Sequence, residues 1–308
     1  MLFGPNRKHP IVGASPAQIL EQAGLAGKRI KRLPSGDDSD PYLCAGRYVL
    51  KLPRRASVVD SQRREFELYR FLERETLPCE IPKAVRRGEN YILITHLGGE
   101  ALSPRDYSRL SERERDCLAR DEARFLRALH AVQTPAELPL FSAVRQDKKT
   151  DFSGDRQALI RILVSKGLLT PKINGTIEEI YQRILNSSLL LCYSSCLIHN
   201  DFSRSNLVFR DKRLYGVIDF GDFRISDPDN DFLCLLDGSS DDFGLEFGRR
   251  VLKFYDHPDP NAVLRKTAFY NAYWPIQQIL LGAERNDTKM ARRGLTTLFH
   301  MDLDDFPI

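Results

Sequence analysis

The sequence has no apolar run that approaches the roughly 20 residues needed to cross a bilayer. Its N-terminus, MLFGPNRKHP, lacks the long apolar core of a signal peptide. The six cysteines are scattered along 308 residues and do not form the regular pattern of a disulfide framework. These absences argue against a membrane-spanning or secreted protein, and we expect a cytoplasmic one.

Internal repeats and low-complexity segments are absent as well, so the composition is that of an ordinary globular chain with 42% hydrophobic and 29% charged residues. A chain of this length can bury a full core and is expected to divide into two lobes. The net charge of +4 is spread unevenly. Residues 1–90 hold 17 Lys and Arg against 11 Asp and Glu, whereas residues 199–246 hold 5 against 11. The basic part suits nucleotide phosphates and the acidic part suits a polycation, although solvated charged faces produce much the same counts.

One stretch in the second half of the chain carries the polar side chains of a magnesium-dependent phosphoryl-transfer site in the expected order. His199, Asp201 and Asn206 form H-x-D-x-x-x-x-N, and Asp219 opens the D-F-G that follows. Phosphoryl transfer needs a carboxylate that orients the attacking hydroxyl and accepts its proton, together with metal ions that neutralise phosphate charge. We assign the first role to Asp201 and the metal to Asn206 and Asp219.

The spacing between the two motifs predicts a β-hairpin. An apolar strand follows Asn206, Asp211 and Lys212 form the turn, and a second apolar strand leads back to Asp219. The hairpin therefore brings two oxygen ligands side by side and leaves coordination positions for water and phosphate, as magnesium prefers. Asp222 is the next candidate ligand. The alternative is a hydrated surface turn, which the joint occurrence of both motifs disfavours.

Three motifs in this stretch resemble those of the aminoglycoside phosphotransferases, and most closely those of the 2''-phosphotransferases. They are C-L-I-H-N-D-F-S at residues 196–203, I-D-F-G-D at 218–222 and I-S-D-P-D-N-D-F at 225–232. A looser resemblance extends from residue 48 to about residue 282. We expect Asp227 and Asp231 of the third motif to brace the catalytic loop by accepting its hydrogen bonds.

The resemblance implies an α+β fold of the two-lobed, protein-kinase-like type. A small N-terminal antiparallel sheet plus a helix, residues 1–97, would bind the nucleotide, and the hinge would lie near residues 94–99. Residues 98–308 would form a larger, mostly helical C-terminal lobe that contains the catalytic-loop hairpin and binds the substrate.

The resemblance also implies a reaction. It is the magnesium-dependent transfer of the γ-phosphoryl group of ATP or GTP to a hydroxyl, the 2'' one, of an aminoglycoside antibiotic, which confers resistance. The alternative is a kinase of the same fold that acts on another small alcohol, such as a sugar or a choline-like molecule. A nucleic-acid-binding module is a third hypothesis, but the basic part lacks interleaved aromatics and a binding motif. We expect no nucleic-acid or membrane partner and a monomer.

The first lobe is predicted to begin with strands at residues 29–33, 42–45 and 48–52, of which the last carries Lys51 in Y-V-L-K. On the tetrapeptide alone, Lys51 would be an exposed strand lysine. A helix predicted over residues 57–75, with Asp60 or Ser61 as N-cap, changes this interpretation because Glu65 lies on its apolar face. A carboxylate on a packed face requires a partner, and the family pairs such a glutamate with the phosphate-binding lysine.

The loop after the first strand contains no G-x-G-x-x-G, which argues against a protein kinase. Backbone amides and the hydroxyl of Ser35 or Ser39 can still hold phosphates. Residues 91–95 form an apolar strand that leads to a hinge-like H-L-G-G, where backbone groups would receive the purine edge. Ile94 is not aromatic, so both ATP and GTP stay open. The expected nucleotide-binding residues are Ser35, Gly36, Ser39, Lys51, Glu65, Ile94, Thr95 and Leu97.

From Ser103 onward the pattern is largely helical, with helices expected over residues 111–132, 155–166 and 177–191. His130 in the first of these is expected to pack and not to bind a ligand. An aminoglycoside carries several ammonium groups, so its site needs carboxylates and an aromatic face. Gly238, Ser239, Ser240 and Gln277 stand where acids are expected, which leaves the acceptor open. The expected substrate-binding residues are Asp201, Asp237, Asp241, Asp242, Glu246, Tyr273 and Trp274.

Overall fold

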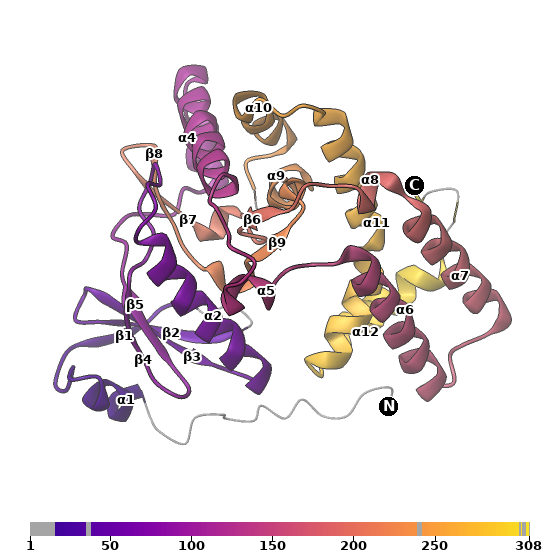
Figure 1. Cartoon of the computed structure of the whole chain (residues 1–308), viewed down its shortest axis with the longest axis horizontal. Coiled ribbons are helices and arrows are strands. Elements are labelled where there is room, and N and C mark those ends of the chain that lie inside the picture. The colour runs from indigo at the N-terminus through magenta and orange to yellow at the C-terminus, as the bar shows by residue number, and fades with distance from the viewer. Residues whose placement is uncertain (1–15, 35–37, 239–241, 302, 304–305, 308) are drawn as a thin grey trace. The chain divides into compact units, whose positions relative to one another are not determined.

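The computed structural model describes residues 16–34, 38–238, 242–301, 303 and 306–307 (Figure 1). The chain divides into two compact units. The described residues of the sheet unit lie within 16–145 and 196–257, and those of the helical unit lie within 146–195 and 258–307. The sheet and the whole catalytic-loop segment therefore belong to one unit. The lobe boundary near residue 97 stays a prediction.

The sheet unit begins with a five-stranded antiparallel sheet in the order β1-β2-β3-β5-β4. The three strands predicted over residues 29–33, 42–45 and 48–52 are present, and so is the strand predicted over residues 91–95. Their ends lie within a few residues of the predicted ends. Helix α2, Ala56–Leu72, packs against the sheet (Figure 1). The strands are β1 Ile30–Arg32, β2 Ser39–Cys44, β3 Tyr48–Pro53, β4 Ala84–Arg87 and β5 Ile92–Thr95.

The start of helix α2 differs from the prediction that Asp60 or Ser61 caps it. The helix begins at Ala56, directly after the strand, and its N-cap is Arg55, whose side chain makes no capping hydrogen bond. Asp60 lies inside the helix and pairs with Arg63, while Ser61 donates its hydroxyl to the Val58 carbonyl. The prediction was wrong because a good capping residue can equally sit one turn inside a helix and bond locally.

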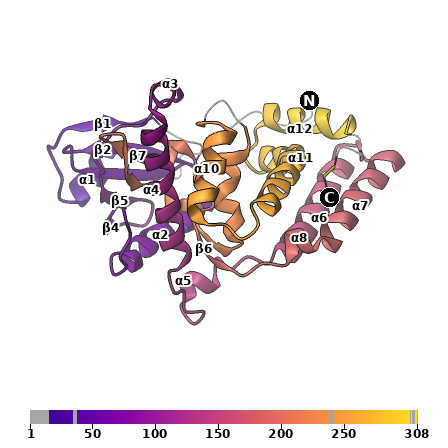
Figure 2. The same cartoon turned by 90° about the horizontal axis from the view of Figure 1, so that it is seen from above.

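Helix α4, Glu112–His130, packs on the strands β6, Cys196–Ile198, and β8, Arg213–Val217. Its bounds agree with those of the helix predicted over residues 111–132. Ser111 caps it in a reciprocal capping box with Glu114. Its apolar face packs on helix α10, Leu245–Tyr255, and the two helices lie side by side (Figures 1 and 2). The other elements of the sheet unit are α1 Pro16–Gln22, α3 Pro104–Ser108, α5 Pro139–Ser142, β6 Cys196–Ile198, η1 Arg204–Asn206, β7 Leu207–Arg210, β8 Arg213–Val217, η2 Phe220–Asp222, β9 Arg224–Ser226, η3 Pro228–Phe232 and α9 Leu233–Leu236.

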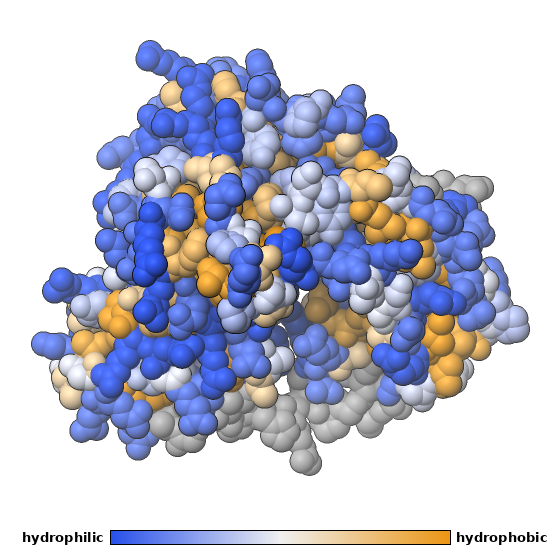
Figure 3. All heavy atoms as spheres, in the orientation of Figure 1, coloured by the Kyte–Doolittle hydropathy of each residue, from blue (hydrophilic) through white to orange (hydrophobic). Residues whose placement is uncertain are grey.

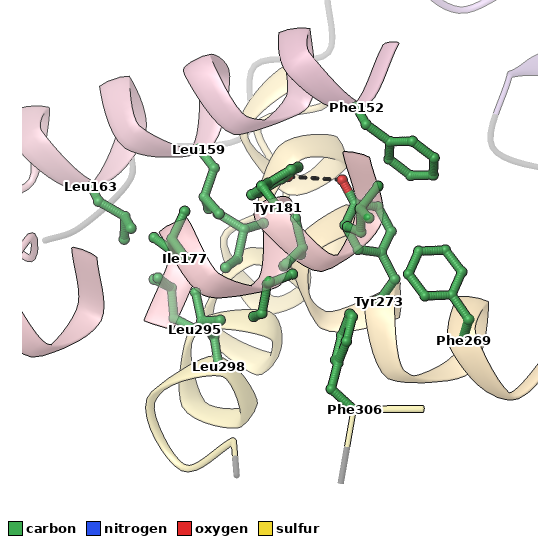
Figure 4. Close-up of a cluster of buried hydrophobic side chains, with 14 of the residues drawn as sticks. Phe152, Leu159, Leu163, Ile177, Tyr181, Phe269, Tyr273, Leu295, Leu298 and Phe306 are labelled. Atoms are coloured by element: carbon green, nitrogen blue, oxygen red, sulfur yellow. Dashed lines mark hydrogen bonds between the residues drawn. The ribbon is translucent and has the colours of Figure 1, made fainter. Parts of the chain in front are cut away.

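The helical unit has its own core of buried aliphatic and aromatic side chains, among which the Tyr181 and Tyr273 hydroxyls share a hydrogen bond of 2.8 Å (Figure 4). Two of its helices begin earlier than predicted. Asp147 caps one by accepting from the Lys149 amide, and Thr170 caps the other, so that Gly175 lies within a helix and does not separate two. The helices are α6 Lys148–Ser165, α7 Pro171–Asn186, α8 Ser188–Leu191, α11 Pro260–Glu284 and α12 Thr288–Phe299.

In the orientation of Figure 3, charged and polar residues dominate the visible face, and apolar residues are exposed in separate groups. Within the described part of the chain, no helix combines the length and the apolar character that crossing a membrane requires.

Glu122 is a buried carboxyl group in helix α4 with no ion-pair or hydrogen-bond partner among the described residues. It is fully buried, and neither of its carboxylate oxygens has a hydrogen-bond partner in the described part of the chain. Burial, reinforced by the negative charges of Asp242 and Asp121, raises its pKa well above the usual value. The folded protein must therefore keep Glu122 protonated at a pH at which the unfolded chain would ionise it.

We predict that Glu122→Gln raises the melting temperature at pH 7 to 8 and changes it little near pH 4.5. A carboxyl group whose pKa is raised by folding loses stability as the pH rises above its unfolded value, and the neutral amide removes this loss. Calorimetry from pH 4.5 to 8 measures the difference. The control is Glu114→Gln in the same helix, because the Glu114 side chain is 35% exposed and ion-paired with Lys212, and its replacement should give no gain at any pH. A parent that is as stable as Glu122→Gln at pH 8 would contradict the prediction.

Candidate active site

The catalytic loop is held by the buried carboxylate of Asp231. Its Oδ2 accepts from the His199 backbone amide at 2.9 Å, and its Oδ1 accepts from the Asn200 amide at 2.6 Å. Asn200 has a φ of +66°, a conformation that asparagine tolerates better than most residues. His130 Nε2 lies 3.1 Å from Asp231 Oδ2, so this histidine packs behind the loop as predicted. The bracing that the sequence predicted for Asp231 is present.

The His199 ring has one hydrogen-bond arrangement that satisfies both nitrogens. Nε2 lies 2.9 Å from the Ile218 carbonyl, which can only accept, and Nδ1 receives the Asp201 backbone amide at 3.3 Å. Nε2 therefore donates to this carbonyl, and Nδ1 accepts from the Asp201 amide. Because Ile218 immediately precedes Asp219, His199 connects the loop that carries Asp201 to the D-F-G segment.

The predicted hairpin is present as β7 and β8. Its turn residues, Asp211 and Lys212, both have positive φ, 49° and 60°, as a type I' turn requires. At the open end the Ile218 amide donates to the Asn206 carbonyl at 2.9 Å. The backbone of Asn206 thus lies next to the residue before Asp219, which confirms the pairing of the two motifs.

Asp201 and Asn206 form a directly bonded pair. The Asn206 side-chain amide donates to the Asp201 carbonyl at 2.9 Å and to Asp201 Oδ2 at 2.8 Å. Two acceptors on one side fix which end of the amide is nitrogen, so Asn206 Oδ1 points away from Asp201. For Asp201 Oδ1, no hydrogen-bond partner is found among the described residues, which leaves this oxygen to accept a proton from a ligand.

The environment of Asp201 suits a proton acceptor. Burial raises the pKa of its carboxyl, and this effect is only partly offset by His199 and by the hydrogen bond from Asn206. A base with a raised pKa is a stronger acceptor in its ionised form, which is the usual way an aspartate is tuned for this role.

Lys51 and Glu65 form the buried ion pair that the sequence predicted. Lys51 Nζ donates to Glu65 Oε1 at 2.8 Å and to Oε2 at 2.7 Å, and also to Asp219 Oδ1 at 2.9 Å. Glu65 is fully buried and Lys51 is 7% exposed. Burial alone would lower the pKa of Lys51, but the charges of Asp219 and Glu65 outweigh it and raise the pKa, so the ammonium form is stable. The Lys51 charge in turn keeps the pKa of Asp219 below its usual value.

The oxygen atoms of Asn206 and Asp219 fit a hard divalent cation. Asp219 is ionised, its side chain is 51% exposed, and its φ of 64° turns the chain sharply at this point. Asn206 uses its nitrogen on Asp201, so its oxygen is the atom available to a metal. One carboxylate and one amide oxygen are a donor set that magnesium accepts beside phosphate and water. By contrast, burial raises the pKa of Asp222, which makes it the less suitable ligand of the two aspartates.

The hinge is built by backbone bonds between the sheet and the catalytic hairpin. The Thr95 amide donates to the Lys83 carbonyl and the His96 amide donates to Arg47, so the Thr95 amide is already used within the sheet. The Thr95 amide is therefore not available to the purine edge that the hinge backbone was expected to bind. For the Leu97 backbone, no hydrogen-bond partner is found in the described part of the chain. Ile94 is buried in β5, paired with Val49.

Gly99 allows the hinge to approach the hairpin closely. A Cβ atom at this position would lie 2.5 Å from Val208 Cγ1 and 2.9 Å from the Phe209 carbonyl. The next residue, Glu100, exchanges backbone hydrogen bonds with Phe209 at 3.0 and 2.9 Å. The second glycine of H-L-G-G is therefore required by packing.

The predicted substrate-binding residues differ in their exposure and in their ion pairs. Asp237 is exposed at the end of α9, and Asp242 is partly buried. Glu246 is exposed, but its carboxylate pairs with Arg250 at 2.7 Å. Trp274 belongs to the helical unit and is 47% exposed.

Tyr273 is a correction to the sequence prediction, because it is a core residue of the helical unit. Its side chain is 1% exposed, its hydroxyl donates to Asp155 Oδ2 at 2.9 Å, and it packs against Phe152 and Phe269 (Figure 4). Gln277 donates to the same Asp155 oxygen at 2.8 Å. Adjacent helix positions point in different directions, so Tyr273 and Trp274 cannot both line one face.

Three predicted residues, Ser35, Gly36 and Asp241, lie outside the described residues. Ser39 lies at the start of β2, where it pairs with Pro53. The contribution of Tyr69 was missed, because the sequence pattern assigned it only to the apolar face of the α2 helix. Its hydroxyl donates to Glu65 Oε1 at 2.9 Å, and the spacing of four residues between them was the available signal.

Known proteins that resemble this chain have been solved with their ligands. The chain is 45% identical to the protein of the gentamicin-APH(2'')-IIa complex, with a TM-score of 0.92, covering 96% of this chain and 99% of that one. For ADP-bound aminoglycoside phosphotransferase APH(2'')-Ib the values are 45%, 0.90, 95% and 99%. For the streptomycin-ATP-APH(2'')-IIa ternary complex they are 45%, 0.90, 96% and 99%.

The sheet with its lysine-glutamate pair, the braced H-x-D loop and the following D-F-G define a phosphotransferase with a protein-kinase-like fold, which transfers phosphate to a hydroxyl group. The model of the phosphotransferase enzyme family, APH, matches residues 29–270. The chain belongs to this family.

We predict that Asp201→Asn lowers turnover by roughly two to four orders of magnitude, because an amide cannot accept the hydroxyl proton. Nucleotide affinity should stay nearly unchanged. Steady-state rates and calorimetric nucleotide binding test both statements, and Asp211→Asn in the hairpin turn is the matched control, since asparagine suits its positive φ. Turnover of Asp201→Asn within threefold of the parent would reject the assignment.

Proposed function

We propose that this enzyme transfers the γ-phosphoryl group of ATP or GTP to the 2''-hydroxyl of an aminoglycoside, and thereby confers resistance. The observation that carries the proposal is the partly buried Asp201 carboxylate, which is bonded to Asn206 through one oxygen and open at the other. Support for the acceptor comes from the similar proteins, whose complexes contain gentamicin or streptomycin, and ATP in one case. The cytoplasmic location and the monomeric state stay predictions.

Asp201 is the group that handles the acceptor proton. Its Oδ1 would receive the hydrogen of the attacking hydroxyl, which orients the oxygen toward the γ-phosphorus and removes its proton as the new P–O bond forms. The leaving nucleoside diphosphate keeps the electrons of the broken bond. Lys51 is suited to the α- and β-phosphates, because Glu65 holds its ammonium group in a fixed position.

We propose magnesium as the cofactor, held by Asn206 Oδ1 and the Asp219 carboxylate. When bound, the metal supplies positive charge to the phosphate oxygens. The residues of this chain prepare for it in two ways: Asp201 orients the Asn206 amide, and Lys51 keeps Asp219 ionised. Both effects are present without a ligand, so the site needs little rearrangement.

Leu97 is the hinge residue that we propose for the nucleobase, because its backbone amide and carbonyl are unused among the described residues. The flanking hinge groups are already bonded, since the His96 amide donates to Arg47 and Glu100 bonds Phe209. An adenine or a guanine edge would bond to the same backbone groups. The buried aliphatic side chain of Ile94 excludes neither base.

The acceptor is tested by a panel of aminoglycosides assayed for nucleoside diphosphate release. We predict phosphorylation of 4,6-disubstituted members such as gentamicin and kanamycin, with a rate that falls steeply with salt because recognition rests on several charge pairs. Mass spectrometry and NMR of the product locate the phosphate. Nucleotide hydrolysis without phosphorylation of any member would reject the aminoglycoside, and sugars and choline-like alcohols would be assayed next.

We predict that Asp219→Ala abolishes the magnesium dependence of nucleotide binding, because it removes the only carboxylate of the proposed donor set. Calorimetry with ADP, with and without magnesium, measures the effect. Asp222→Ala is the matched variant, since it removes a carboxylate three residues away. Metal dependence that survives in Asp219→Ala and disappears in Asp222→Ala would transfer the ligand role to Asp222.

A further inference from the structure

Lys51 has no spare hydrogen-bond donor in this structure. An ammonium group has three N–H bonds, and Lys51 directs two of them to Glu65 and the third to Asp219. To bond a nucleotide phosphate, Lys51 must turn one N–H away from a carboxylate. If that bond is the one to Glu65 Oε1, a fully buried carboxylate oxygen loses a charged donor, which is costly unless another donor remains.

Tyr69 is that other donor. It lies one helical turn after Glu65 in α2 and is fully buried, and its hydroxyl donates to Glu65 Oε1 at 2.9 Å. The bond ends on the same oxygen that accepts from Lys51 at 2.8 Å, whereas Oε2 accepts from Lys51 at 2.7 Å. Tyr69 therefore duplicates one Lys51 bond and not the other.

The Tyr69 hydroxyl also reaches the D-F-G segment. It lies 3.5 Å from the Phe220 amide, at the residue after Asp219, and the two rings pack edge to face with centroids 5.7 Å apart. Phe220 in turn packs on His199, with ring centroids 4.4 Å apart. Full burial and the contact with Phe220 fix the Tyr69 ring, so its hydroxyl stays in place when Lys51 moves.

We propose that Tyr69 is a positioning residue for phosphoryl transfer, which keeps Glu65 Oε1 hydrogen-bonded while Lys51 turns one donor to a nucleotide phosphate. The proposal rests on the phosphate-binding role proposed for Lys51, and it is independent of the acceptor. Without a nucleotide, Lys51 satisfies both Glu65 oxygens by itself. The Tyr69 hydroxyl is therefore needed more in the nucleotide-bound protein than in the free protein.

The test is Tyr69→Phe, which removes the hydroxyl and keeps the ring. We expect the dissociation constant for ADP to rise about tenfold, since a hydrogen bond to a charged group contributes roughly this factor or more. The melting temperature of the free protein should fall by much less than that of the nucleotide-bound protein. The matched control is Tyr91→Phe, because Tyr91 is also buried in the sheet unit and its hydroxyl has no hydrogen-bond partner among the described residues.

A double-mutant cycle with Glu65→Gln shows whether Tyr69 acts through Glu65. In the Glu65→Gln background, Tyr69→Phe should change the ADP dissociation constant by less than about twofold, because the bonded carboxylate is already gone. An equal effect in both backgrounds would overturn the proposal. So would an unchanged dissociation constant in Tyr69→Phe with equal losses of melting temperature in the free and bound proteins, which is the result for a merely structural tyrosine.

Each variant is compared with its own ligand-free melting temperature, so a partial loss of stability does not prevent the measurement. Binding is measured with ADP alone and needs no acceptor. A failed aminoglycoside assay with the expected Tyr69 result would therefore reject the proposed acceptor and keep this inference. Phosphorylation of an aminoglycoside together with an unchanged ADP dissociation constant in Tyr69→Phe would keep the proposed acceptor and reject this inference.

Discussion

The carboxylate of Asp231 is the group on which the active site depends most. It has no solvent contact, and it receives the backbone amides of His199 and Asn200 together with the ring of His130. The loop at this point follows a left-handed backbone conformation that few residues adopt without support. Because the His199 ring bonds both the Asp201 amide and the Ile218 carbonyl, the bracing extends to both aspartates of the site. Asp231 therefore supports the loop that carries Asp201 directly and the D-F-G segment through His199.

The next constraint is charge. Lys51 is the ammonium group that faces Glu65 and Asp219 directly, while the negative charge of Asp222 adds to burial in raising the pKa of Asp201. The cluster is therefore negative without its ligands and would repel a nucleotide by itself. A divalent cation would offset most of this negative charge and let the same carboxylates bind phosphate through the metal. The acidity of the site supports the magnesium proposal as much as the identity of the two oxygen ligands does.

The sequence predicted the parts of the site that depend on local spacing. The hairpin follows from strand periodicity, the Lys51-Glu65 pair from helix periodicity together with the family resemblance, and the support from Asp231 from the resemblance, and all three are present. Predictions failed where the same side chain suits either packing in a core or binding a ligand. Tyr273 is amphipathic, and only the packing of the helical unit decides that its hydroxyl faces Asp155 and not a ligand. The N-cap of helix α2 was also predicted wrongly. The helix begins directly after strand β3, and no side chain caps it.

The fold constrains the residues around the phosphates more strongly than the candidate residues for binding the acceptor. Glu65 and Asp231 are fully buried and hydrogen-bonded, so replacing either one leaves unpaired buried groups and is expected to cost about 3 to 5 kcal/mol. The candidate acceptor contacts are exposed, as Asp237 and Trp274 are, and replacing an exposed side chain costs little stability. Gly238, beside Asp237, illustrates the result, since it has a positive φ of 74° and open space around its missing side chain. The chemistry is therefore fixed by the same bonds that hold the fold, whereas the choice of acceptor can change without disturbing them.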